Sequence, residues 1–247
     1  MIEILIIVVF AALQSILGIG ILFFGTPTLI LLGYPFIETL AVVLPASMAV
    51  SFLQLVRGSL PEASWRRRFT LWCLIPLIAV LGSSILFKWQ FQLELIIACI
   101  LFLYVLIRIS PRLHQYLRDG VRARASLWLG LIGTIHGLSN LGGGLLAIFA
   151  ANNFNDKLTI RNHIAFCYLA FASVQLCILA IVAPHSLQWV QLTYAATSGV
   201  VFAVCERGIF HSISFPTFDR TFTVVIGCYS ILIFLKIAGV FDNMSAA

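Results

Sequence analysis

Long apolar runs constrain this 247-residue chain more than any other feature of its sequence. Eight such blocks follow one another, and most are close to the roughly 20 residues that a helix needs to cross a bilayer. Because 61% of the residues are hydrophobic and only 10% are charged, a soluble domain of this size could not bury the apolar surface. The sequence therefore predicts an all-α polytopic membrane protein, multi-pass in a cell membrane.

The blocks are separated by short polar or basic connections that we interpret as loops. In chain order the blocks are Ile2–Leu32, Thr39–Val56, Phe69–Phe87, Phe91–Ile107, Ser126–Ala151, Ile164–Ala183, Leu187–Cys205 and Phe222–Val240. The connections include RGSLPEASWRRR, RISPRLHQYLRDGVRAR, NNFNDKLTIRNH and ERGIFHSISFPTFDR. The N-terminus carries Glu3 in place of a positive region, so we expect it to be retained rather than cleaved as a signal peptide.

Two of the blocks are interrupted by glycine. Gly130–Gly144 reads GLIGTIHGLSNLGGG, and Leu17–Thr28 reads LGIGILFFGTPT. Each glycine inside a helix costs about 1 kcal/mol relative to alanine. Irregular backbone at membrane depth is tolerated only where it is buried in protein or lines a watery cavity. We therefore expect both stretches to be helix breaks at a binding site.

The two broken blocks occupy matching positions in the two halves of the chain. Gln14 and Gly18–Gly20 precede His136 and Gly142–Gly144 by about 122 residues, and AVSFLQL parallels AFASVQL at an offset of 121. Such an internal duplication, with interrupted blocks at corresponding places, is typical of secondary transporters whose site lies between inverted repeats. We expect one transport domain of residues 1–247, with repeats at residues 1–124 and 125–247.

The basic residues are compatible with two topologies. If all eight blocks cross the membrane, 10 of the 15 Lys and Arg residues face one side and 5 the other. If each broken block is a re-entrant hairpin instead, only Lys88 and Lys236 lie opposite the other 13. The positive-inside rule favours the hairpins, which give three crossings per half and outward-facing termini. A single broken crossing by Ser126–Ala151 stays open.

Backbone groups at the breaks are the first candidates for binding. Gly18, Gly20 and Gly25 in half one, and Gly142, Gly143 and Gly144 in half two, would free N–H groups at half-helix ends. A helix N-terminus stabilises an anion by roughly 0.3–2 kcal/mol. No Lys or Arg lies deep inside a block, so an anion site would depend on helix dipoles and hydroxyl groups. The alternative is that these glycines only allow close helix packing.

His136 is the sharpest single candidate because it is the only histidine inside a long apolar block. Its charge can change near neutral pH, which suits proton coupling or pairing with an anion. The alternative is a neutral ring bonded to a loosened backbone carbonyl. The remaining polar candidates near the breaks are Ser139 and Asn140 in half two and Gln14, Ser15, Thr26 and Thr28 in half one. Pro45 and Ser47 suggest a kinked cavity wall, and Gln54 and Gln175 fit either ligand contact or interhelical bonding.

Several function classes find no support in the sequence. The six cysteines are scattered without a CxxC or metal spacing, and we expect them to be core packers. No paired carboxylates, Ser-His-Asp arrangement or metal-ligand spacing indicates an enzyme or a cofactor. The basic residues that give the net charge of +6 lie beside membrane segments, which indicates interaction with lipid headgroups rather than with nucleic acid. The sequence leaves the oligomeric state open.

The glycine-rich segments resemble the sulfite exporter TauE/SafE family of membrane permeases. The resemblance rests on GLIGTIHGLSNLGGGLLAIFA, on GIGILFFGTPTLILLGYPFIETLAVVLPASMAV and on the basic connection RGSLPEASWRR. It implies site-forming positions at Gly18, Gly20, Pro27, Gly33 and Pro35, and at Gly137, Gly142, Gly143 and Gly144. This chain departs from the family pattern in having GIG for a triple glycine, LPASM for a Thr-Ser pair, and Phe149-Ala150 where a proline is often found.

The resemblance implies a secondary transporter of a small anion such as sulfite or sulfoacetate in the bacterial inner membrane. Protons or sodium are the candidate coupling ions, and His136 is the only proton carrier that the sequence offers. The family departures motivate an alternative hypothesis, a non-transporting membrane subunit that scaffolds a partner or a lipid-processing enzyme.

Overall fold

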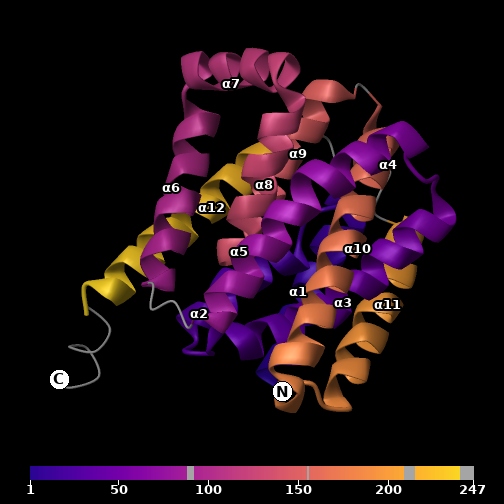
Figure 1. Ribbon diagram of the computed structural model, residues 1–247, viewed down its shortest axis with the longest axis vertical. Coiled ribbons are helices and arrows are strands. Elements are labelled where there is room, and N and C mark those ends of the chain that lie inside the picture. Colours follow the sequence, from indigo (N-terminus) through magenta and orange to yellow (C-terminus); the bar gives the residue numbers. More distant parts are fainter. Residues whose placement is uncertain (88–91, 155, 209–214, 240–247) are drawn as a thin grey trace.

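A computed structural model describes residues 1–87, 92–154, 156–208 and 215–239, and every regular element in these ranges is helical (Figure 1). The elements are α1 (Ile2–Leu17), the π-helical turn η1 (Ile21–Gly25), α2 (Thr26–Leu31), α3 (Phe36–Arg57), α4 (Ala63–Phe69), the π-helical turn η2 (Thr70–Leu74), α5 (Ile75–Leu86), α6 (Leu93–Ile109), α7 (Pro111–Ala123), α8 (Ala125–Ser139), α9 (Gly143–Asn153), α10 (Lys157–Val182), the 3-10 turn η3 (Pro184–Ser186), α11 (Val190–Gly208) and α12 (Phe215–Ile237).

The helices fit a membrane protein, as predicted. Within the described residues, Phe36–Arg57, Ala63–Leu86 and Lys157–Val182 are long and apolar enough to cross a bilayer. The second of these is continuous because α4, η2 and α5 join end to end. Six shorter apolar helices accompany them, and many large apolar side chains remain exposed on the outer surface, where lipid would cover them.

Both glycine-interrupted blocks are broken helices, but the first break is shorter than predicted. Helix α1 ends at Gly18, whose φ of 77° stops the helix, and helical structure resumes at Ile21. The predicted interruption over Leu17–Thr28 is therefore wrong for most of its length. Bulky apolar residues from Ile21 onward bury well as a helix, and Pro27 is tolerated because it lies in the first turn of α2.

The second break falls where the sequence placed it. Helix α8 ends at Ser139, Asn140 adopts a left-handed conformation with φ of 62°, and α9 starts at Gly143. Asparagine tolerates this conformation better than most other residues with a Cβ atom. The two helix stops, Gly18 and Asn140, are thus separated by the predicted repeat offset.

Each broken block turns back toward the end of the molecule where it began. The Tyr34 hydroxyl, in the turn after α2, donates to Glu3 Oε1 at 2.7 Å, so the beginning and end of the first block touch. Similarly, α9 packs against α7, which immediately precedes α8. Figure 1 shows α7 lying across one end of the bundle with α9 beside it, and the N-terminus at the opposite end. We call these the α7 end and the N-terminal end.

The two halves of the chain interlock. Helix α1 packs on α11 of the second half, and α8 packs on α5 of the first. Helix α3 packs on α10 and α6 packs on α12, and each pair joins a helix of the first half to one of the second. Each broken block is therefore held by the opposite half, and η1 of the first block contacts α9 of the second.

The four connections predicted as loops and named above are partly helical, the last of them because α11 extends to Gly208 and α12 starts at Phe215. Helix α4 starts at Ala63 and includes Arg66–Arg68, α7 occupies Pro111–Ala123, and α10 starts at Lys157. Local caps explain two of these starts, because Ser110 Oγ accepts from Leu113 N and Asp156 Oδ2 accepts from Thr159 N. Basic residues do not break a helix that lies at an aqueous end. The limits predicted at Phe91 and Val240 lie outside the described residues.

Candidate functional site

One hydrogen bond joins the two broken blocks. Asn140 Nδ2 donates to Thr26 Oγ1 at 2.8 Å, and both side chains are fully buried. Thr26 opens α2 and Asn140 ends α8, so the bond connects broken blocks from opposite halves of the chain. Gly144 lies against the rings of Phe23 and Tyr104 close by. Two predicted site residues, Thr26 and Asn140, thus come together at one buried place.

The first break is sealed by the Gln14 side chain. Gln14 Oε1 accepts from the backbone N of Ile21 at 3.1 Å, and Nε2 lies 3.1 Å from both Ser47 Oγ and Ser51 Oγ. Gln54 Nε2 also donates to the Gln14 carbonyl at 2.8 Å. Both ends of the Gln14 amide are therefore satisfied within the protein, and Ser47 on α3 takes part in that seal.

The second break leaves buried polar atoms without protein partners. His136 is fully buried, and within the part of the chain that the structure describes neither ring nitrogen makes a hydrogen bond. Asn140 Oδ1 and the Tyr168 hydroxyl are also buried without a hydrogen-bond partner among the described residues. Gln175 approaches the His136 ring, but neither of its amide atoms completes a hydrogen bond among the described residues. An unsatisfied buried polar group costs about 1–3 kcal/mol, so this cluster favours a ligand.

The cluster is held by close packing around the glycine triplet. The His136 ring stacks on Phe171, with ring centroids 4.0 Å apart. A Cβ atom at Gly142 would lie 2.6 Å from His136 Cβ, and one at Gly143 would collide with the Tyr168 side chain. Gly142 and Gly143 therefore allow His136 and Tyr168 to reach the start of α9. Close packing, the alternative interpretation of the triplet, accounts for its glycines at this point.

Other predicted residues serve the helices instead. Ser15 Oγ donates to Ala11 O at 2.6 Å and Ser139 Oγ to Ile135 O at 2.8 Å, each within its own helix. Gly137 faces α5, where a Cβ atom would lie 2.9 Å from Leu77 O. The expectation that Gly137 opens the site is thus not supported by its position. Pro45 lies inside α3, two and six residues before the serines that bind Gln14.

Gly33 and Pro35 lie at a separate cavity of about 650 Å³ at the N-terminal end. Its lining residues are Ile30, Gly33, Tyr34, Pro35, Phe36, Gln92, Glu94, Leu95, Lys236 and Ile237. Lys236 Nζ bonds Ile30 O at 2.7 Å and Glu94 Oε1 at 3.0 Å. The hydrogen bond from Tyr34 to the Glu3 carboxylate raises the pKa of that phenol to about 12, which keeps it a donor.

Sequence reasoning missed Tyr168, Tyr104 and Arg161. Tyr168, Phe171 and Gln175 are spaced as one face of α10, so Gln175 was a usable signal for Tyr168. Tyr104 on α6 donates to Leu141 O at 2.8 Å, a contact that no local pattern indicates. Arg161 lies in the second turn of α10, before the predicted block Ile164–Ala183, and is only 5% exposed, a burial that the sequence did not predict. Among the described residues, no group of three or more His, Cys, Asp or Glu side chains could hold a metal ion.

Comparison with known families decides the identity of this arrangement. The family model described as Sulfite exporter TauE/SafE matches residues 3–233, which include both breaks and every residue of the cluster. The chain belongs to the sulfite exporter TauE/SafE family. No curated protein and no solved structure matches it. The resemblance predicted from the glycine-rich segments is therefore confirmed.

Membership in the TauE/SafE family implies a membrane transporter of sulfur-containing anions. The apolar helices agree with this, because they describe a multi-pass membrane protein. The substrate of a TauE/SafE transporter is a small anion, and the protein is surrounded by the lipid bilayer. The breaks and the cluster beside them are the features of this TauE/SafE chain that such an anion could use.

Proposed function

We propose that this protein is a secondary transporter that carries sulfite or a small organosulfonate such as sulfoacetate across the bacterial inner membrane. The anion binds where the two broken helices meet. The observation that supports this most directly is the buried cluster of His136, Asn140, Tyr168 and Gln175. Both His136 nitrogens, Asn140 Oδ1, the Tyr168 hydroxyl and both Gln175 amide atoms lack hydrogen-bond partners among the described residues.

The chemistry of the cluster suits an oxyanion. The Tyr168 hydroxyl and Gln175 Nε2 are donors, and the N-terminus of α9 adds the positive end of a helix dipole. A sulfite or sulfonate group presents three oxygen atoms that accept such bonds. Donors without a full positive charge would hold an anion moderately, which allows its release during transport.

Proton coupling follows from the surroundings of His136. Neither ring nitrogen has a hydrogen-bond partner among the described residues, so no carboxylate is bonded there to balance a charged imidazole. A bound anion would supply the missing negative charge. Anion and proton would then bind together, and His136 would carry the proton. Sodium remains the alternative coupling ion, although the described residues offer no carboxylate cluster for it.

The broken blocks act as re-entrant hairpins in two inverted repeats, each with three crossings. The contact between Glu3 and Tyr34 supports this, as does the packing of α9 on α7. Arg66–Arg68 in α4 and Arg112 in α7 lie toward the α7 end, which the positive-inside rule assigns to the cytoplasm. Cysteine labelling tests the topology. A cysteine at Asn153 should react from inside and one at Ser186 from outside, whereas labelling of Asn153 only from outside overturns it.

Membrane potential favours export. Moving a monoanion outward across an inside-negative membrane gains about 2.3 kcal/mol per 100 mV. Export of the anion alone therefore needs no coupling ion, whereas uptake does, and a proton carried on His136 would serve uptake. The orientation of the α7 end toward the cytoplasm makes that end the entry side for export.

Flux in proteoliposomes tests the function. Purified protein should move at least one anion among sulfite, thiosulfate, sulfoacetate and small carboxylates, and the variant Tyr168→Phe should move it more slowly. An absence of flux for every anion at every pH would instead favour the alternative, a membrane subunit that scaffolds a partner or a lipid-processing enzyme.

A further inference from the structure

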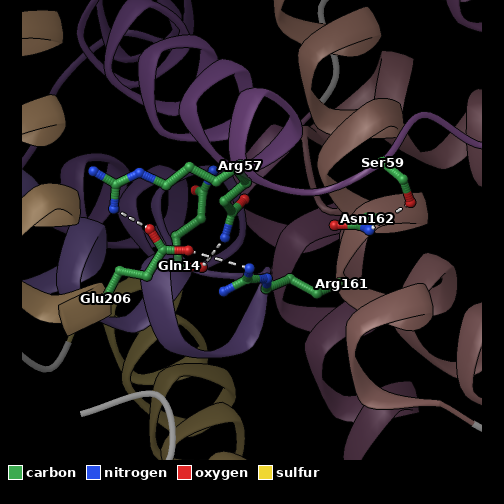
Figure 2. A network of polar contacts seen from close by, with 7 residues as sticks. Gln14, Arg57, Ser59, Arg161, Asn162 and Glu206 are labelled. Atoms are coloured by element: carbon green, nitrogen blue, oxygen red, sulfur yellow. Dashed lines mark hydrogen bonds and ion pairs between the residues drawn. The ribbon is translucent and has the colours of Figure 1, made fainter. Parts of the chain in front are cut away.

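Three charged side chains from three helices converge near the first break. Arg57 ends α3, Arg161 lies in the second turn of α10, and Glu206 lies near the end of α11. Glu206 Oε1 pairs with Arg161 Nη2 at 3.2 Å, and Glu206 Oε2 pairs with Arg57 Nη1. Figure 2 shows the Glu206 carboxylate between the two guanidinium groups. We call these residues the triad.

The triad is largely removed from water on the side of Arg161. The side chains of Arg161 and Glu206 are 6% and 14% exposed, whereas that of Arg57 is 40% exposed. Arg57 also lies over the ring of the buried Phe202, 5.3 Å from its centroid. Two positive charges meet one negative charge, so the triad carries a net positive charge of one. This arrangement attracts small anions from the aqueous end.

Short contacts connect the triad to the first break. A Cβ atom at Gly18 would lie 3.6 Å from Arg161 Cγ, so the stem of this arginine covers the end of α1. Gln54, one turn before Arg57 on α3, donates to the Gln14 carbonyl at 2.8 Å. Figure 2 shows Gln14 together with the triad. An anion released from Arg161 toward the interior would arrive at the break that Gln14 seals.

We propose that the triad is an anion-binding gate at the α7 end, in which Glu206 occupies the place that a small oxyanion takes on Arg161. A carboxylate and a sulfite or sulfonate group offer the same paired oxygens to a guanidinium fork. When the anion binds, Glu206 keeps Arg57 and gives up Arg161, which unlinks α11 from α10. When the anion leaves, Glu206 returns and joins them again. The gate rests on the proposed function of anion transport.

Charge-removing variants separate a gate from a purely structural ion pair. Glu206→Gln removes the competing carboxylate, so the KM for sulfite applied at the α7 end should fall by about tenfold while kcat also falls because closure is impaired. Arg161→Gln should raise the same KM by a similar factor. Glu62→Gln, a carboxylate change at the same end without an arginine partner among the described residues, is the matched control and should leave the KM unchanged.

A binding measurement keeps the gate testable apart from flux. Sulfite should raise the Tm of the detergent-purified protein at a lower concentration for Glu206→Gln than for wild type, and not at all for Arg161→Gln. If Glu206→Gln does not fold, Arg57→Gln replaces it. Without Arg57, Glu206 pairs with Arg161 alone and should hold it more tightly, so sulfite binding should weaken. Unchanged sulfite binding and KM in these variants would overturn the gate. Sulfite binding at Arg161 without flux of any anion would overturn the transport function instead.

Discussion

Gly18 and Asn140 end α1 and α8 with the same left-handed backbone conformation, 122 positions apart in the sequence. Two different solutions serve the same purpose. Gly18 has no Cβ atom and adopts this conformation freely, whereas Asn140 adopts it with a side chain that also bonds Thr26 across to the other half. Asn140 therefore couples the stop of one helix to the start of another.

Replacing Asn140 separates these two roles. Asn140→Gly retains the left-handed conformation but loses the bond to Thr26, so the protein should fold and its transport rate should fall by more than about tenfold. Asn140→Ala loses the bond and also strains the backbone by roughly 1–2 kcal/mol. Its Tm should therefore lie below that of Asn140→Gly in a thermal melt. Equal Tm values for the two variants would contradict the backbone role.

Removing the unpartnered Tyr168 hydroxyl should leave stability unchanged or increase it but reduce transport. Tyr168→Phe removes a buried group that lacks a protein partner, so the Tm should hold or rise, while anion flux should fall. Tyr104→Phe is the matched control, because its hydroxyl bonds Leu141 O at 2.8 Å. That variant should lose about 1 kcal/mol of stability. A Tyr168→Phe protein with wild-type flux would exclude the hydroxyl from the site.

The sequence predicted the places of the breaks because glycine and asparagine act locally on the backbone. Gln14 and His136 could be found for a related reason, since a polar side chain beside a break in an apolar block must bond the backbone or a ligand. Which of these applies could not be read from the chain. Gln14 bonds two serines on α3 that lie more than 30 residues away, whereas His136 faces Phe171.

The sequence did not allow us to predict which residues tertiary packing brings to the site. Arg161 looked like part of a polar connection, because only the Asp156 cap and the burial of α10 against α3 extend the helix back to Lys157. The family resemblance implied Gly137 as a site residue, yet it lies on the side of α8 that approaches Leu77. The sequence alone does not distinguish a glycine that exposes backbone N–H groups from a glycine that permits close helix packing.

Gly20 is a glycine whose replacement should be poorly tolerated. A Cβ atom there would lie 2.6 Å from Gln14 N and collide with Phe10 O, both in the backbone of α1. Gly20→Ala should therefore abolish the yield of monodisperse protein in size-exclusion chromatography. Gly82→Ala in α5 is the control, because nothing lies within 4 Å of that Cβ position. It should stabilise the protein by up to about 1 kcal/mol. A well-folded Gly20→Ala protein would contradict the packing of the first break.

His136 can be tested without disturbing the ring that stacks on Phe171. His136→Phe keeps an aromatic ring against Phe171 and removes both nitrogens, so the protein should fold with an unchanged or higher Tm. Flux should be lost, or should become independent of pH between about 5.5 and 8 if the anion still binds. Transport assays of His136→Phe across this range measure the effect. A pH dependence like that of wild type would remove His136 from proton coupling.

The cap of α10 should make stability depend on acid. Hydrogen bonds from the backbone N and hydroxyl of Thr159, at 2.8 and 2.9 Å, lower the pKa of Asp156 below its ordinary value. Because the folded-state pKa is the lower one, the stabilisation is complete above the ordinary value of about 3.9 and is lost as the pH falls through the folded-state pKa. Asp156→Asn keeps a capping side chain that does not titrate. Thermal melts should show the Tm of wild type falling relative to Asp156→Asn below about pH 4. Parallel Tm curves for the two proteins would show that the cap contributes nothing to the acid sensitivity.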